Sequence, residues 1–218
     1  MTAEIKAVAR RHLETDGANL SLRAVARDMG MVSSALYRYF ASRDELLTAL
    51  ILDAYNDLGA TVEAADAAVT DRADLRGRWL AAARAVRGWA LAKPAEYALL
   101  FGSPVPGYAA PQDTIAAAAR TSLVLIGILA DGHANGALAT GSTRRVRLAS
   151  AVRADLAVLT GQVAPGLPEQ LLLLGMTGWL ELFGTVSFEL FGQLNNVIEA
   201  RAQFFDHQME LMSDLMGL

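Results

Sequence analysis

The sequence contains no cysteine among its 218 residues. Disulfide scaffolds, cysteine-based zinc sites, iron–sulfur clusters and thiol nucleophiles are therefore excluded. Only six prolines occur and 53% of the residues are hydrophobic, which excludes a disordered or collagen-like chain. Uninterrupted apolar runs long enough for a membrane span are missing, and charged residues at positions 4, 6, 10 and 11 break up any signal peptide. We expect a soluble cytoplasmic protein.

Alternation of apolar and polar residues, the pattern typical of strands, is almost absent as well. Apolar residues instead recur at helical spacing along nearly the whole chain, so the predicted fold class is all-α. Ser21 and Asp71 are predicted N-caps, and Gly30 is a predicted turn in the left-handed conformation. The predicted helices cover residues 2–16, 21–29, 33–40, 42–63, 71–93, 95–101, 112–134, 143–163, 169–191 and 198–216.

Ser42 and Glu45 give the sharpest local signal in the sequence. A serine at the N-cap followed three residues later by glutamate is a capping box, which satisfies free backbone N–H groups at a helix start. The long helix from Ser42 towards Glu63 is predicted to begin here.

The net charge of −4, with an isoelectric point near 5.4, at first argues against a nucleic-acid partner. The charge is uneven, however. Residues 1–48 hold seven basic and six acidic residues, whereas the remainder holds 12 basic and 17 acidic residues. The N-terminal segment therefore has a net positive charge. Whether this charge favours DNA binding depends on how the basic side chains are arranged in space.

The helices at 21–29 and 33–40, joined at Gly30, have the pattern of a helix-turn-helix DNA reader. Val25, Ala26 and Met29 are predicted to pack inward with Leu36 and Phe40. Small residues on the second helix would approach base edges, while arginines and tyrosines would reach phosphates. The helix start at Ser42 offers backbone N–H groups to a phosphate. The candidate DNA-binding residues are Ser21, Arg23, Ser33, Ser34, Ala35, Tyr37, Arg38, Tyr39, Ser42 and Arg43.

Residues 20–47 resemble the DNA-binding signature of TetR/AcrR-family transcriptional regulators. The resemblance implies that Ala35, Tyr37, Arg38 and Tyr39 lie on the recognition helix, that Arg23 reaches into the groove, and that Arg43 holds the DNA backbone. Val32 departs from the family pattern, because a Ser or Thr cap usually stands there.

The rest of the chain is similar to a C-terminal class named for a Trp-His-Gly motif. Residues 94–97, 100–102 and 179–184 carry this similarity, with Phe183 in place of the histidine. The resemblance implies two domains, a DNA-binding domain at 1–48 and a ligand-binding and dimerisation domain at 49–218. It also implies a homodimer built on the helices at 169–191 and 198–216, and a cavity for a small molecule.

Wide apolar stripes on these last two helices predict an interface between two copies, with core packing inside one chain as the alternative. The stripes comprise Leu171, Leu174, Gly178, Leu182, Val186 and Leu190, then Phe204, Phe205, Met209, Met212 and Leu215. Gly175, Gly178 and Gly184 would allow close helix approach.

Five aromatic residues are candidates for a pocket that binds a hydrophobic effector, although such residues more often belong to the core. They are Trp89, Tyr97, Phe101, Trp179 and Phe183. The three histidines lack metal-ligand spacing, and the sequence carries no nucleophile elbow, phosphate loop or dinucleotide fingerprint. We therefore expect no metal, no cofactor and no enzymatic activity.

Together these features predict a ligand-responsive regulator, of the repressor kind, that binds an inverted-repeat DNA operator as a homodimer and is released by a hydrophobic small molecule. The alternative is a helical ligand-binding module or enzyme with a vestigial DNA-binding head.

Overall fold

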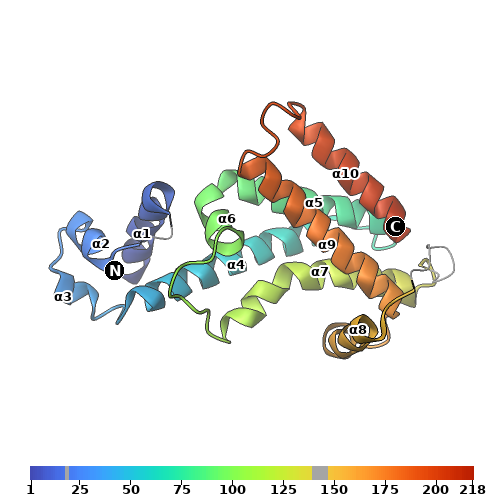
Figure 1. The fold of residues 1–218 in the computed structure, drawn as a ribbon, viewed down its shortest axis with the longest axis horizontal. Helices are drawn as coiled ribbons and strands as arrows, with labels where there is room; N and C mark the ends of the chain where they lie inside the picture. Colours follow the sequence, from blue (N-terminus) through green and yellow to red (C-terminus); the bar gives the residue numbers. More distant parts are fainter. Residues whose placement is uncertain (18–19, 139–146) are drawn as a thin grey trace. The chain divides into compact units, whose positions relative to one another are not determined.

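The computed structural model describes residues 1–17, 20–138 and 147–218. These ranges form ten helices and contain no strand, so the all-α prediction is confirmed. Labelled as in Figure 1, the helices are α1 (Thr2–Asp16), α2 (Leu22–Asp28), α3 (Ser33–Leu36), α4 (Arg43–Ala68), α5 (Leu75–Ala92), α6 (Pro94–Phe101), α7 (Thr114–Ala134), α8 (Ser150–Val163), α9 (Glu169–Leu190) and α10 (Arg201–Met216).

Two predicted caps fix helix starts in the N-terminal region. The Ser21 hydroxyl accepts the Ala24 N–H at 3.4 Å and opens α2. The Ser42 hydroxyl accepts the Glu45 N–H at 3.1 Å. The Glu45 carboxylate in turn accepts the Ala41 N–H at 2.6 Å, one residue before the donor of a standard capping box. The predicted box is therefore present in a slightly shifted form.

Other helix limits differ from the prediction for local reasons. Helix α4 continues to Ala68 instead of ending near Glu63, because the added residues are rich in alanine, the best helix former. Asp74, not Asp71, caps α5: its carboxylate accepts the Gly77 N–H at 2.8 Å, whereas Asp71 accepts the Ala73 N–H in the preceding turn.

Near the C-terminus, two helices start later than predicted. Helix α8 begins at Ser150 after three non-helical residues, and the predicted start at 142–143 lies outside the described residues. Helix α10 begins at Arg201 instead of residue 198. Positive φ angles at Gly192 and Asn196 belong to a series of turns that separates it from α9.

The chain divides into two compact units. The first unit consists of Met1–Gly59 and Trp89–Ala119, and the second unit consists of Ala60–Gly88 and Arg120–Leu218. Helices α4, α5 and α7 contribute residues to both. The predicted domain boundary after residue 48 stays a prediction, because compactness within one chain does not test independent folding.

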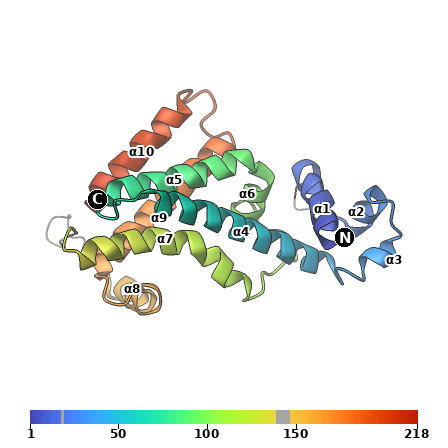
Figure 2. The same ribbon diagram turned by 180° about the vertical axis from the view of Figure 1, so that it is seen from behind.

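In the first unit, α1 packs against α2 and α6, and α2 packs against α3. Figure 2 shows α1, α2 and α3 gathered at the N-terminal end of α4. Their inner faces form one apolar cluster, here called the head core. It consists of Ile5, Val8, Ala9, Leu13, Leu20, Leu22, Val25, Ala26, Leu36, Phe40, Leu46, Leu47 and Leu50.

In the second unit, α9 packs against both α8 and α10. The Trp79 indole on α5 is buried and donates a hydrogen bond to the Met209 carbonyl on α10 at 2.9 Å. A Cβ on Gly178 would lie only 3.2 Å from the Trp79 ring and from the Met216 sulfur. Glycine at this position therefore permits α9 to approach both neighbours closely.

The apolar stripes predicted to form an interface on α9 and α10 lie largely inside the chain. Leu171, Leu182 and Phe205 are almost completely buried within the second unit, whereas Leu215 is exposed. The interpretation of these stripes as an interface is therefore wrong, because helical periodicity identifies a buried face without saying what buries it. The exposed apolar residues of the two helices are Met176, Leu180, Phe188, Leu211 and Leu215.

Helices α7 and α9 are long and apolar enough to cross a membrane by length and composition alone. Half of the α9 segment is buried inside the protein, and core helices of soluble proteins pass the same test. In α7, Arg120 pairs with Glu63 at 2.6 Å and Asp131 pairs with Arg78 at 2.8 Å. Paired charges of this kind are expected of helices within a folded bundle.

Arg78 links three helices of the second unit. Its side chain is 3% exposed and donates hydrogen bonds of 2.8 Å to Asp66 at the end of α4 and to Asp131 on α7. Burial alone would raise the pKa of Asp66, but hydrogen bonds from Arg78 and Arg72 hold that pKa below its usual value. The carboxylate therefore stays charged at neutral pH.

We predict that Arg78→Met lowers the free energy of unfolding by about 3 kcal/mol, since it removes one partner of a largely buried ion pair. Urea unfolding followed by circular dichroism measures the change. The control is Arg84→Met on the same helix, where Arg84 and Asp206 are both substantially exposed and the loss should stay below about 1 kcal/mol. Equal losses in the two variants would contradict the assigned role of Arg78.

Candidate nucleic-acid interface and apolar cavity

Helices α2 and α3 are held at a fixed angle by the residues that were predicted to pack inward. Val25, Ala26, Leu36 and Phe40 are buried in the head core, and Met29 packs against it. Gly30 has a φ of 65°, a conformation that a side chain would penalise. The turn and the core together direct the opposite faces of both helices outward.

The residues expected to face DNA lie on that outward side. Tyr37 is 46% exposed and Tyr39 is 42% exposed. Ser21, Arg23, Ser34, Arg38 and Ser42 are exposed, while Ser33, Ala35 and Arg43 are half-buried. Seven of the ten candidates are thus exposed, and contact of any of them with DNA stays a prediction.

Helix α3 is shorter than the predicted helix at 33–40, because regular helix ends at Leu36. The N–H groups of Arg38 and Tyr39 bond to carbonyls three residues earlier, at 3.3 and 2.9 Å, which is the tighter 3₁₀ pattern. Val32 supplies no side-chain cap at the start of the helix. Tyr37, Arg38 and Tyr39 therefore occupy a turn that follows α3.

A surface hollow of about 520 Å³ lies where the starts of α2 and α4 meet. Arg23, Tyr37, Ser42 and Arg43 line it together with Ser21. The Arg43 Nε donates to the Leu20 carbonyl at 3.1 Å and so ties the two helix starts together. Free backbone N–H groups at helix starts and two guanidinium groups make this hollow suitable for a phosphate.

Several cations that give the N-terminal segment its positive charge are paired internally. Lys6 and Arg10 on α1 each lie 2.6 Å from the Asp53 carboxylate on α4. Among the described residues of this segment, Arg11, Arg23, Arg27 and Arg38 have no ion-pair partner. Three of these four arginines lie on α2 or just after α3, and these can meet phosphates there.

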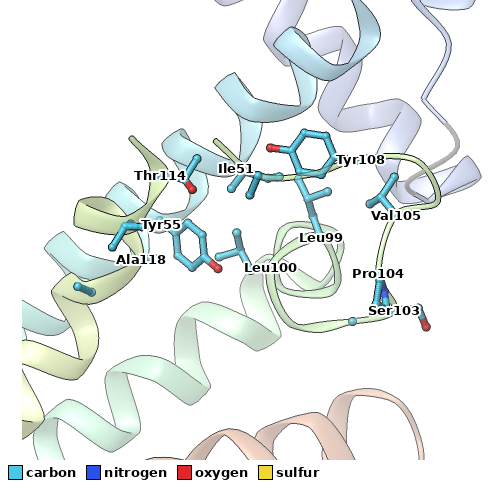
Figure 3. A pocket seen from close by; sticks show the side chains of 14 residues that line it. Ile51, Tyr55, Leu99, Leu100, Ser103, Pro104, Val105, Tyr108, Thr114 and Ala118 are labelled. Carbon is cyan, nitrogen blue, oxygen red and sulfur yellow. The ribbon is translucent and has the colours of Figure 1, made fainter. Parts of the chain in front are cut away.

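The first unit also contains an apolar cavity of about 610 Å³ that sequence reasoning did not find. Residues from α4, α6, the 102–113 segment and the start of α7 surround it (Figure 3). The sequence showed the proline-rich 102–111 segment only as a loop. The lining residues are Ile51, Tyr55, Leu99, Leu100, Gly102, Ser103, Pro104, Val105, Tyr108, Ala110, Thr114, Ile115, Ala118 and Ala119.

The five aromatic candidates for a ligand pocket do not line this cavity. Tyr97 is fully buried, and Phe101 packs beside it while meeting the cavity residue Tyr55 edge-on at 6.2 Å. Trp89 is buried and donates its indole N–H to Asp57 at 2.5 Å. Trp179 and Phe183 form a ring pair in the second unit. Ligand contact by these five residues stays a prediction.

Within the described ranges, no group of three or more His, Asp or Glu side chains is placed to hold a metal ion.

Two short helices packed on one apolar core, with Arg23 on the first helix and Tyr37, Arg38 and Tyr39 exposed just after the second, are typical of the class of helix-turn-helix transcription regulators. The family model "Bacterial regulatory proteins, tetR family" matches residues 5–50. The model "Tetracyclin repressor-like, C-terminal domain" matches residues 79–212. The chain belongs to the TetR family and is a transcriptional regulator.

Individual relatives agree with this assignment. The HTH-type transcriptional regulator Rv1816 of Mycobacterium tuberculosis is 41% identical over 233 aligned residues, which cover 96% of this chain and 89% of the relative. Mb1846 of Mycobacterium bovis has the same identity and coverage. The crystal structure of the protein SCO4313 has a TM-score of 0.76 at 36% identity, covering 97% of this chain and 94% of that one.

We predict that Ser42→Ala lowers the free energy of unfolding by about 1 kcal/mol, because it removes the acceptor for the Glu45 N–H. Ser42→Asp should stay close to the parent protein, since aspartate caps helices equally well and favours a helix start electrostatically. Thermal and urea unfolding of both variants are the measurements. The exposed Ser34→Ala serves as the control, and equal destabilisation by alanine and aspartate at position 42 would refute capping.

Proposed function

We propose that the chain is a homodimeric repressor that binds an inverted-repeat DNA operator and is released from it by a hydrophobic small molecule. The observation that carries the proposal is the exposed surface formed by α2, α3 and the turn after α3, which presents Arg23, Arg38 and two tyrosines. Such a regulator acts in the cytoplasm and has no enzymatic activity.

The small side chains of Ser33, Ser34 and Ala35 favour close approach of α3 to base edges in the major groove. Arg23 and the turn residues Arg38 and Tyr39 would contact bases and phosphates at the sides of that helix. The hollow lined by Ser21, Ser42 and Arg43 would seat one backbone phosphate. Phosphate contacts then set the register of the protein on DNA, and contacts from α3 select the sequence.

The proposed homodimer uses α9 and α10, but through the face opposite to the buried stripes. On α9, the exposed side chains of Met176, Leu180 and Phe188 share a helix face with Gly184, since their spacings are multiples of four residues. A Cβ on Gly184 would meet no atom within 4 Å, so this glycine is not needed for packing within the chain. On α10, Leu211 and Leu215 form a second exposed apolar pair.

Exposed apolar patches of this kind mark contact surfaces, and two copies of a helix pair bury them as a four-helix interface. A two-fold dimer presents its two copies of α3 in opposite directions along DNA. It therefore reads an inverted repeat when the two copies lie about 34–36 Å apart.

We predict that the full chain shifts DNA from upstream of its own gene in a salt-sensitive way, and enriches an inverted repeat from a random DNA library. The double variant Arg38→Ala, Tyr39→Ala should weaken binding at least 10-fold, whereas Arg84→Ala in the second unit should bind as the parent protein does. If the protein enriches no inverted repeat from the library, the result would instead support a vestigial DNA-binding domain.

We predict that Leu180→Glu together with Phe188→Glu converts a dimer to a monomer, because two charges per copy would be buried at the interface. Light scattering after gel filtration measures the mass. Val158→Glu on α8 is the matched control, since Val158 is exposed at 63% and Leu180 at 60%. A dimer that survives the double substitution would place the interface elsewhere.

A further inference from the structure

The apolar cavity in the first unit is lined by uncharged residues. None of its 14 lining residues carries a charge, and ten of them are aliphatic, glycine or proline. Its volume of about 610 Å³ lies within the range of roughly 300–1,000 Å³ that is typical of small-molecule sites. A charged ligand would find no ionic partner among these residues.

The polar groups of the wall differ in whether the protein already satisfies them. The Tyr108 hydroxyl is hydrogen-bonded to Thr48 at 2.9 Å, and the Thr114 hydroxyl donates to the Pro111 carbonyl at 2.6 Å. The Tyr55 and Ser103 hydroxyls, by contrast, form no hydrogen bond with any residue that the structure describes. Ser103 is exposed to water, whereas Tyr55 is half-buried. Figure 3 shows the Tyr55 side chain turned toward the same space as Leu99 and Leu100.

Tyr55 is suited to act as a hydrogen-bond donor. Burial raises the pKa of its phenol, and the nearby Tyr108 phenol raises it further. The group therefore stays protonated at neutral pH. A ligand oxygen would satisfy a donor that otherwise loses part of its hydration, which favours ligands that carry such an oxygen.

We propose that this cavity binds an uncharged, mainly apolar ligand that carries one hydrogen-bonding group for the Tyr55 hydroxyl. The assignment rests on the proposed ligand-responsive function, whose effector the cavity would hold. Binding can nevertheless be measured without DNA, so the two proposals can fail separately.

The cavity has a direct connection to the DNA-binding helices. Leu99, Val105 and Tyr108 line the cavity and also pack against the head core. Tyr108 is additionally hydrogen-bonded to Thr48, between the head-core residues Leu47 and Leu50 on α4. A ligand that displaces these three side chains changes the packing beneath α2 and α3. By linkage, DNA that favours one packing changes the affinity for the ligand by the same factor.

A second hollow in the first unit is a weaker candidate for a ligand. Arg10, Asp53, Asp57 and Lys93 line it, but these charges already pair with one another. Glu96 also lines it and pairs with none of these four residues, but its carboxylate is the one lining charge outside the two pairs.

The proposal is tested with prodan, a neutral naphthalene dye with one ketone oxygen, added to the full chain in the absence of DNA. We expect saturable binding of one dye per chain with a blue-shifted emission. Ala118→Trp should abolish it, because Ala118 is an exposed lining residue and the bulk of a tryptophan there would occupy the space for the dye. Ala116→Trp, two residues earlier on the exposed side of α7 and outside the lining, is the matched control and should bind normally.

Tyr55→Phe should weaken prodan binding about 3–10-fold, the loss expected for one hydrogen bond. The anionic dye anilinonaphthalene sulfonate should not displace prodan. Ser103→Trp, also exposed at the cavity wall, provides a second blocking variant if Ala118→Trp does not fold. Unchanged binding in a folded blocking variant, unchanged affinity in Tyr55→Phe, displacement by the anionic dye, or no prodan binding by the parent protein would each overturn the proposal.

Discussion

The beginning of α4 contributes side chains both to the head core and to the apolar cavity. The proposed DNA binding and the proposed ligand binding therefore both depend on it. Leu46, Leu47 and Leu50 complete the head core, which holds α2 and α3 with their polar faces outward. Ile51, which directly follows Leu50, and Tyr55, one turn later, line the apolar cavity. Because these residues follow one another on a single helix, a change of packing on one side has few ways to leave the other side unchanged.

Helix caps and turns, which depend on residues close together in the sequence, could be predicted. Contacts between residues far apart in the sequence could not. Ser21, Gly30 and the pair Ser42 and Glu45 act within a few residues, so their patterns predicted the turns and caps that the structure contains. The length of α3 was overestimated, because 3₁₀ bonds and regular helical bonds suit the same residues at 37–39.

The same distinction explains what was missed in the candidate site. The stripes on α9 and α10 were correctly identified as apolar faces, but periodicity is identical for a face buried by the same chain and a face buried by a second copy. The cavity depends on four segments that meet only in the fold, and its unsatisfied donor, Tyr55, is one tyrosine among five in the sequence. Likewise, the pairing of Lys6 and Arg10 with Asp53 joins residues more than 40 positions apart.

The first unit is assembled from two separate stretches of chain, and this has a consequence for protein engineering. Residues of α6 and of the segment after it pack against α1 and the head core. A hybrid that transplants residues 1–48 onto another regulator would leave those supporting side chains behind and expose the apolar surface they cover. Recombination between regulators of this type should therefore exchange residues 89–119 together with the N-terminal stretch.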